Sequence, residues 1–188
     1  MLQRVFVDLY RMPIGFTVVC LVGAFLFWCI LTRCIQEAGR KQRILYGFFC
    51  GVVFLVWVLG VLYITVLMRT PGEREVHWQP FYQLQQLFTG GPKELLRTLW
   101  MNVLLFVPGG LFLSAQLPAR WPWWVRIPLV LIVLIGLSVG IEWLQYQYAL
   151  GVVEADDLLC NTLGAVLGVF IQEWALYRMH KRVAKDRN

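Results

Sequence analysis

Five long apolar segments, separated by short clusters of charged residues, constrain the fold of this 188-residue chain more than any other feature. A helix rises about 1.5 Å per residue, so about 20 apolar residues are needed to cross a hydrocarbon core about 30 Å thick. Segments of this kind are Ile14–Thr32, Ile44–Met68, Leu99–Leu117, Ile127–Leu150 and Leu158–Tyr177. The sequence therefore predicts an all-α, polytopic integral membrane bundle of about five transmembrane helices, with residues 1–188 forming a single membrane domain.

The composition excludes the soluble alternatives. Hydrophobic residues make up 59% of the chain and charged residues only 15%, whereas soluble domains carry about 25% charged residues. The five cysteines include no C-x-x-C pair, so neither a disulfide framework nor a zinc site is indicated. The net charge of +6 comes from basic residues that flank apolar segments, a pattern that sets membrane orientation, and we expect no nucleic-acid partner.

Lys and Arg residues are distributed unevenly between the two sides of the predicted bundle. The side that holds the N-terminus and the loops 69–98 and 151–157 carries six, whereas the side that holds the loops 33–43 and 118–126 and the basic tail 178–188 carries eleven. Because the more basic side is usually cytoplasmic, we predict that the N-terminus lies outside and the C-terminus lies in the cytoplasm.

An aromatic cluster, Trp121-Pro122-Trp123-Trp124, lies between the third and fourth segments, on the predicted cytoplasmic side. Tryptophan is enriched where a membrane meets water, because one end of its ring system is apolar and the other is polar. We therefore expect this cluster to anchor the bundle at the interface, with Arg120 and Arg126 beside the lipid headgroups.

Polar side chains in and beside the last three segments fall at a similar depth, roughly 6 to 12 Å from the predicted outer helix ends. Ser138, Glu142 and Gln145 share one helical face, and Asp157 shares a face with Asn161. A carboxylate in hydrocarbon is costly, so Glu142 requires a partner in protein or in a water-filled cavity. The sequence therefore predicts an outward-opening polar pocket that contains Asn102, Glu142, Gln145, Asp156, Asp157 and Asn161.

Three interpretations of this polar cluster remain open from the residues alone. The amides could form hydrogen bonds between helices, with Glu142 protonated or paired with Arg97. Glu142 and Asp157 could instead carry out acid–base chemistry, because burial would raise the pKa of the glutamate. The oxygen ligands would also suit Mg²⁺ or Ca²⁺, but no dedicated ion-binding loop accompanies them, so we assign no metal site and expect no cofactor beyond such a divalent cation.

Glycine and proline mark two features of the predicted helices. Pro108-Gly109-Gly110 lies in the middle of the third segment, where proline removes a backbone donor, and predicts a kinked or broken helix. Gly164 and Gly168 are four residues apart in the fifth segment. Such spacing of small residues lets another helix approach closely, so we expect these two glycines to serve packing.

Three blocks of residues resemble the VanZ-like family of small integral membrane proteins. They are Asn102-x-x-x-Phe106-x-Pro108-x-Gly110, Ser138-x-x-x-Glu142-x-x-Gln145, and Asp156-Asp157-x-x-x-Asn161-x-x-Gly164 continuing to Gly168. With Gln79-Pro80-Phe81, which is similar to a Pro-Phe element of the family, they cover about residues 69–170. The order and spacing of the blocks together carry the resemblance.

The chain departs from the family pattern at Gly151. The family usually has an arginine and an aromatic residue ahead of the acidic pair, whereas this chain has Gly151-Val152-Val153-Glu154-Ala155 before Asp156. If that arginine pairs with a carboxylate of the pocket, this chain must use another cation, for which Arg69, Arg74 and Arg97 are the candidates.

The resemblance implies a multi-pass protein of the bacterial cytoplasmic membrane, in a family named for an accessory that lowers susceptibility to teicoplanin. Our leading hypothesis is non-enzymatic: the polar pocket binds an envelope component, with membrane lipids and either a peptidoglycan precursor or a glycopeptide antibiotic as partners. The alternatives are an integral-membrane enzyme that acts on a lipid or polyprenyl-linked headgroup through Glu142 and Asp157, and a structural or partner-binding subunit. The sequence does not indicate catalytic residues, a particular ligand or an oligomeric state.

Overall fold

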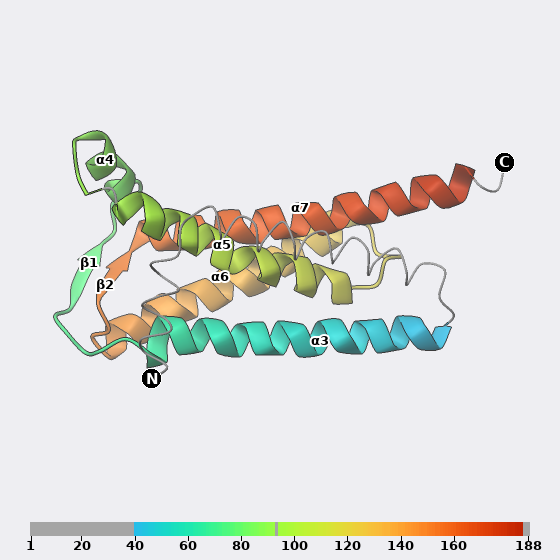
Figure 1. The fold of residues 1–188 in the computed structure, drawn as a ribbon, viewed down its shortest axis with the longest axis horizontal. Coiled ribbons are helices and arrows are strands. Elements are labelled where there is room, and N and C mark those ends of the chain that lie inside the picture. Colours follow the sequence, from blue (N-terminus) through green and yellow to red (C-terminus); the bar gives the residue numbers. More distant parts are fainter. Residues whose placement is uncertain (1–39, 93, 186–188) are drawn as a thin grey trace. The chain divides into compact units, whose positions relative to one another are not determined.

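The computed structural model describes residues 40–92 and 94–185 (Figure 1). The first predicted segment, Ile14–Thr32, lies outside the described residues. Residues 49–188 form one compact unit, and the contacts given below are those of its described part.

Helices dominate the structure, which confirms the all-α class. A long helix, α3 (Arg40–Leu62), continues into a π-helical turn, η1 (Tyr63–Leu67). A short helix, α4 (Tyr82–Phe88), precedes three long ones, α5 (Glu94–Gln116), α6 (Trp123–Gln147) and α7 (Ala155–Lys185). Among the described residues, four helical stretches are long and apolar enough to cross a membrane: Ile44–Leu67, Glu94–Gln116, Trp123–Gln147 and Ala155–Arg178.

These four stretches correspond to the last four predicted segments, but each helix begins several residues before the predicted start, and α7 also ends later than predicted. Helix α5 begins at Glu94 instead of Leu99, and α7 continues to Lys185, so that much of the predicted basic tail is helical. An apolar run marks only the part of a helix that lies in hydrocarbon. Residues with high helix propensity, such as Arg, Lys, Met and Ala, can continue the helix into the polar flanks without lengthening the apolar run.

A two-stranded parallel sheet, which the sequence did not predict, closes one end of the bundle (Figure 1). Strand β1 (Glu75–His77) pairs with β2 (Val152–Glu154), so that Glu75 lies opposite Val152 and His77 opposite Glu154. The amide of Gly72 also donates to the carbonyl of Ala149 at 2.7 Å. These bonds attach the loop after η1 to the connection between α6 and α7.

Helices α5 and α7 run in the same direction and lie against each other, whereas α6 runs the opposite way (Figure 1). Their backbones touch at glycines. A Cβ atom on Gly164 would overlap the carbonyl oxygen of Val103, and one on Gly168 would overlap that of Val107. From the other side, a Cβ atom on Gly110 would overlap the carbonyl oxygen of Ala165. Small residues commonly allow such close backbone contact between membrane helices.

Pro108 lies inside α5, and the helix continues through it without interruption. The alternative of a broken helix is therefore wrong. The indole of Trp57 packs against Gly109, where any Cβ atom would overlap the ring, and its Nε1 donates to the carbonyl of Leu105 at 2.8 Å. The core around this contact comprises Val61, Phe106, Val130, Leu134, Ile141, Ala165 and Val169.

Candidate functional site

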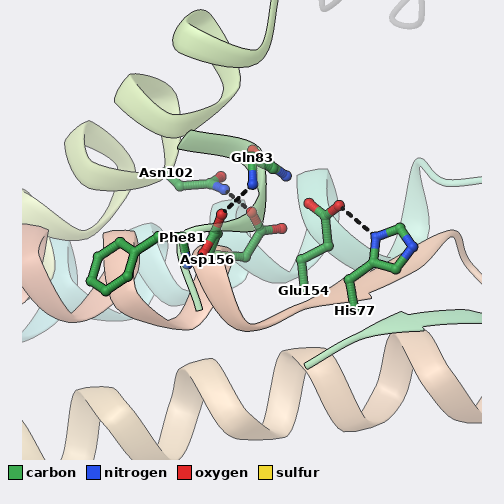
Figure 2. Close-up of polar contacts among 7 residues, drawn as sticks. His77, Phe81, Gln83, Asn102, Glu154 and Asp156 are labelled. Carbon is green, nitrogen blue, oxygen red and sulfur yellow. Dashed lines mark hydrogen bonds and ion pairs between the residues drawn. The ribbon is translucent and has the colours of Figure 1, made fainter. Parts of the chain in front are cut away.

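The end of the bundle that carries the sheet and α4 also gathers most of the predicted polar residues; we call it the polar end. Asn102, in the third turn of α5, donates from Nδ2 to Oδ1 of Asp157 at 2.6 Å. Figure 2 shows Asn102 reaching from α5 toward the start of α7. Asp157 is 8% exposed and lies in the first turn of α7, where the partial positive charge of a helix N-terminus stabilises an acidic group.

Asp156 has a different environment from its neighbour. It is 3% exposed, its Oδ1 accepts a hydrogen bond from the amide of Phe81, and its Oδ2 accepts one from the amide of Gln83 at 2.7 Å (Figure 2). Phe81 precedes α4 with a left-handed φ of 63°, which is costly for a bulky residue and requires support from its surroundings. Both oxygens of Asp156 therefore hold the N-terminus of α4 in place.

Arg69 is the cation that the structure places among the carboxylates of the polar end. Its guanidinium interacts electrostatically with Glu142 of α6, Glu154 of β2 and Asp157 of α7. Its Nη1 donates to the carbonyl of Leu150 at 3.3 Å, and a Cβ atom on Gly151 would lie 3.1 Å from the same nitrogen. Arg69 therefore brings a guanidinium to the position of Gly151 from a distant part of the chain.

The other two candidate arginines are placed differently. The Nη2 of Arg74 donates to the carbonyl of Gln147 at 3.1 Å, and its guanidinium lies 5.8 Å from the ring centre of Tyr146. Arg97 lies in the first turn of α5 and is partly buried. Of the three candidates, Arg69 best fits the predicted role of a cation beside the pocket carboxylates.

Four buried oxygen atoms at the polar end accept no hydrogen bond from the described residues: Gln83 Oε1 on α4, and Glu142 Oε2, Gln145 Oε1 and Asn161 Oδ1 on α6 and α7. The rest of the last three side chains is engaged. Gln145 donates from Nε2 to the carbonyl of Thr65 at 3.0 Å, and Asn161 donates from Nδ2 to the hydroxyl of Ser138 at 2.9 Å. Glu142 accepts a hydrogen bond from the backbone of Glu154. The polar end thus has a surplus of acceptors.

Glu154 and His77 belong to the site, and the sequence did not reveal them because the sheet that joins them was not predicted. His77 Nδ1 lies 3.4 Å from Glu154 Oε1 (Figure 2). Burial raises the pKa of the Glu154 carboxyl above its usual range, and the hydrogen bond and charge of His77 oppose this shift. The three-residue strands are too short for an alternating pattern to identify them.

A second buried polar cluster occupies the opposite end of α5, α6 and α7, which we call the arginine end. Arg126 is 2% exposed, so the prediction that it lies beside lipid headgroups is wrong. Its Nη2 lies 3.0 Å from Oε1 of Glu173 and donates to the carbonyl of Ser114 at 3.2 Å. The Ser114 hydroxyl donates to the same Glu173 oxygen at 3.1 Å. Glu173 lies within the last apolar segment, and an acid there requires a buried partner; that signal could have identified the pair.

Among residues 40–92 and 94–185, no three His, Cys, Asp or Glu side chains are grouped so that they could hold a metal ion. Asp156, one of the carboxylates considered as a ligand, is directed to the backbone of α4.

Comparison with known proteins connects this arrangement to a family. The family model described as VanZ/LLP1 matches residues 24–176. The chain belongs to the VanZ/LLP1 family. The matched range includes the three sequence blocks and both polar clusters. No curated protein and no solved structure matches the chain.

Proposed function

We propose that this VanZ-family membrane protein binds a component of the bacterial cell envelope at its polar end and thereby lowers susceptibility to teicoplanin-type glycopeptides. The observation that carries the proposal is the set of three buried oxygens, from Glu142, Gln145 and Asn161, that have no donor among the described residues. Leaving a buried acceptor without a partner costs about 1–3 kcal/mol. A bound molecule that supplies donors would recover that free energy.

The charge of the polar end indicates which molecules would fit. Glu142, Glu154 and Asp157 each interact electrostatically with Arg69. Acceptor oxygens and carboxylates favour a ligand with N–H or O–H groups, and an ammonium group would gain most. Amino groups, amides and hydroxyls of this kind occur in peptidoglycan precursors and in glycopeptides, which supports either as the ligand.

Drug susceptibility in a glycopeptide-sensitive bacterium tests the proposal. We expect the wild-type chain to raise the inhibitory concentration of teicoplanin above that of the empty vector. The double variant Glu142→Gln and Asn161→Ala should return it to the vector level, because it removes a carboxylate and one unpartnered acceptor. Arg74→Gln is the matched control. Arg74 contacts the Gln147 carbonyl and the Tyr146 ring rather than the unpartnered oxygens, so this variant should retain the wild-type effect.

Two results would overturn the proposal: a wild-type chain that leaves teicoplanin susceptibility at the vector level, or a double variant that retains full protection. Detergent melting temperatures and membrane levels of each protein must accompany these measurements. If alanine at Asn102 or Asn161 lowers the melting temperature while every phenotype is intact, the polar end serves the structure only, and the chain acts as a structural or partner-binding subunit.

Proximity of two carboxylates favours one further candidate function. Glu142 and Asp157 are close enough to repel each other, and paired carboxylates with different environments can divide acid and base roles. An enzyme that acts on a lipid or polyprenyl-linked headgroup would use them in this way. Mass spectrometry of lipid extracts tests this candidate: deletion should change a headgroup, and Glu142→Gln should reproduce the change. Identical extracts would exclude it.

A further inference from the structure

A cavity of about 580 Å³ opens at the arginine end, away from the site described above. Its walls come from the connection between α5 and α6, the start of α6 and residues 170–177 of α7. Aromatic rings provide much of the wall, and the charged residues are two arginines and one glutamate. The lining residues used below are Arg120, Trp123, Arg126, Phe170, Glu173 and Trp174.

The aromatic wall faces the surroundings of the bundle. Trp123 is 66% exposed, Phe170 56% and Trp174 52%. In a water-soluble protein such exposure would mark a protein-binding surface. In a membrane helix the same rings face acyl chains and the headgroup boundary, because Trp combines an apolar ring system with a polar N–H. The cavity therefore suits a molecule with apolar chains.

The charges at the cavity are positive in sum. Glu173 forms an ion pair with Arg126, and its Oε1 also accepts the bond from Ser114. Arg120 adds a second guanidinium to the lining, and Arg178 lies with its guanidinium 4.8 Å from the ring centre of Trp174. Among the described residues, the Nε of Arg126 has no hydrogen-bond partner although it is buried. Guanidinium groups bind phosphate oxygens in a favourable geometry.

We propose that this cavity binds one anionic phospholipid of the surrounding bilayer. The phosphate contacts Arg120 at the mouth, next to the buried Arg126–Glu173 pair, and the acyl chains lie along Phe170 and Trp174. A zwitterionic lipid has the same chains, but its ammonium group would meet this surplus of positive charge. The cavity therefore distinguishes lipids by headgroup charge, independently of any ligand at the polar end.

Lipid retention tests the proposal with the full chain in nanodiscs that contain equal amounts of phosphatidylglycerol and phosphatidylcholine. After extraction into mild detergent, native mass spectrometry counts the lipids that remain bound. We expect about one phosphatidylglycerol per chain to be retained in preference to phosphatidylcholine. Arg120→Gln should reduce its retention about fivefold, the effect of one cation near anionic headgroups. Arg120 is exposed, so this variant should fold.

Two further variants separate the cavity from general surface charge. Lys181→Gln removes an exposed cation from α7 beyond the cavity and should retain the wild-type preference. Ala119→Trp fills the cavity from an exposed lining position and should lower the retention of both lipids. Equal retention of the two lipids by the wild type would overturn the proposal. So would equal losses in Arg120→Gln and Lys181→Gln, or full retention in Ala119→Trp.

Discussion

The polar end and the arginine end of the bundle each hold an arginine near carboxylates, but they differ in how completely the charged groups are paired. At the arginine end, the Arg126 guanidinium contacts the Glu173 carboxylate and the Ser114 carbonyl, and the Ser114 hydroxyl donates to Glu173, all within 3.0–3.2 Å. Of these groups, the Nε of Arg126 lacks a partner among the described residues. At the polar end, three carboxylates interact electrostatically with the same guanidinium, that of Arg69, and one of them, Glu154, also lies 3.4 Å from His77. Four buried acceptors there have no donor among the described residues.

This difference separates groups that stabilise the bundle from groups that remain available. A buried ion pair whose members also bond other groups recovers much of its desolvation cost internally. The desolvation cost of unpartnered acceptors is not recovered within the protein, but a bound molecule with hydrogen-bond donors can recover it. We therefore assign the Arg126–Glu173 pair a structural role beside its cavity, and the Arg69 cluster a ligand-binding role. The following changes, ordered by expected effect, test this division.

The largest effect is expected from Gly164→Leu, because both ends depend on the backbone contact between α5 and α7. A side chain at Gly164 would overlap the Val103 carbonyl, which cannot move aside as a flexible side chain would. The loss should exceed the roughly 1–3 kcal/mol typical of overpacking. Thermal unfolding in detergent measures it. Gly136→Leu on α6 is the control, since a Cβ atom there meets open space; similar losses in both variants would contradict the described packing.

Removing one partner of the pair at the arginine end should have the next largest effect. Arg126→Leu leaves Glu173 buried without its cation, a change that typically costs about 3–5 kcal/mol. The double variant Arg126→Leu and Glu173→Leu should recover most of this loss. Arg69→Leu at the polar end should cost less, because Arg69 is exposed and its carboxylates lack full pairing in any case. Chemical denaturation compares the three, and an equal cost at the two ends would remove the distinction between them.

A local effect is expected from Asp156→Ala, which removes both acceptors for the amides of Phe81 and Gln83. Losing a cap of this kind costs about 1–2 kcal/mol. Hydrogen exchange should accelerate in residues 81–88 and remain unchanged in α5 and α6. Asp157→Ala, one residue away, should leave exchange in α4 slow. Accelerated exchange in α4 from both variants would mean that Asp156 is not what holds it.

The smallest effect is expected for the hydrogen bond between Asn102 and Asp157. Single alanine variants and the double variant form a cycle that isolates the coupling between these two side chains. Interhelical hydrogen bonds in membrane proteins contribute about 0.6 kcal/mol on average, with a maximum of about 1.7. We expect a coupling in this range from unfolding in detergent. Additive losses would show that the 2.6 Å contact contributes nothing of its own.

The sequence predicted the helical membrane class and the positions of four spans well, because apolar length is imposed directly by the bilayer. Depth alone also grouped Asn102, Asp157 and Asn161 in one predicted pocket, without indicating which side chains would bond. It did not distinguish Asp156 from Asp157, whose partners are set by the conformation of residues 78–88. Arg126 was misplaced because neighbouring tryptophans suggested an interface position, whereas its partner Glu173 lies 47 residues further along the chain. Contacts between distant segments leave no local pattern.

The choice among the three candidate arginines illustrates the same limit. Charge counting placed Arg69, Arg74 and Arg97 on one side of the membrane but could not rank them. The ranking depends on the parallel pairing of β1 with β2, which brings the connection around Gly151 to the guanidinium of Arg69. The pairing of two three-residue strands from distant segments thus determines which arginine lies beside Gly151.

Mass spectrometry of the small molecules that copurify from bacterial membranes with the wild type and with Glu142→Gln tests the division between the ends most directly. The account predicts that a donor-bearing envelope component accompanies the wild type and is lost from the variant. An anionic phospholipid should be retained by both. If both proteins carry the same set of molecules, or if the variant loses the phospholipid instead, the polar end does not have the binding role assigned to it.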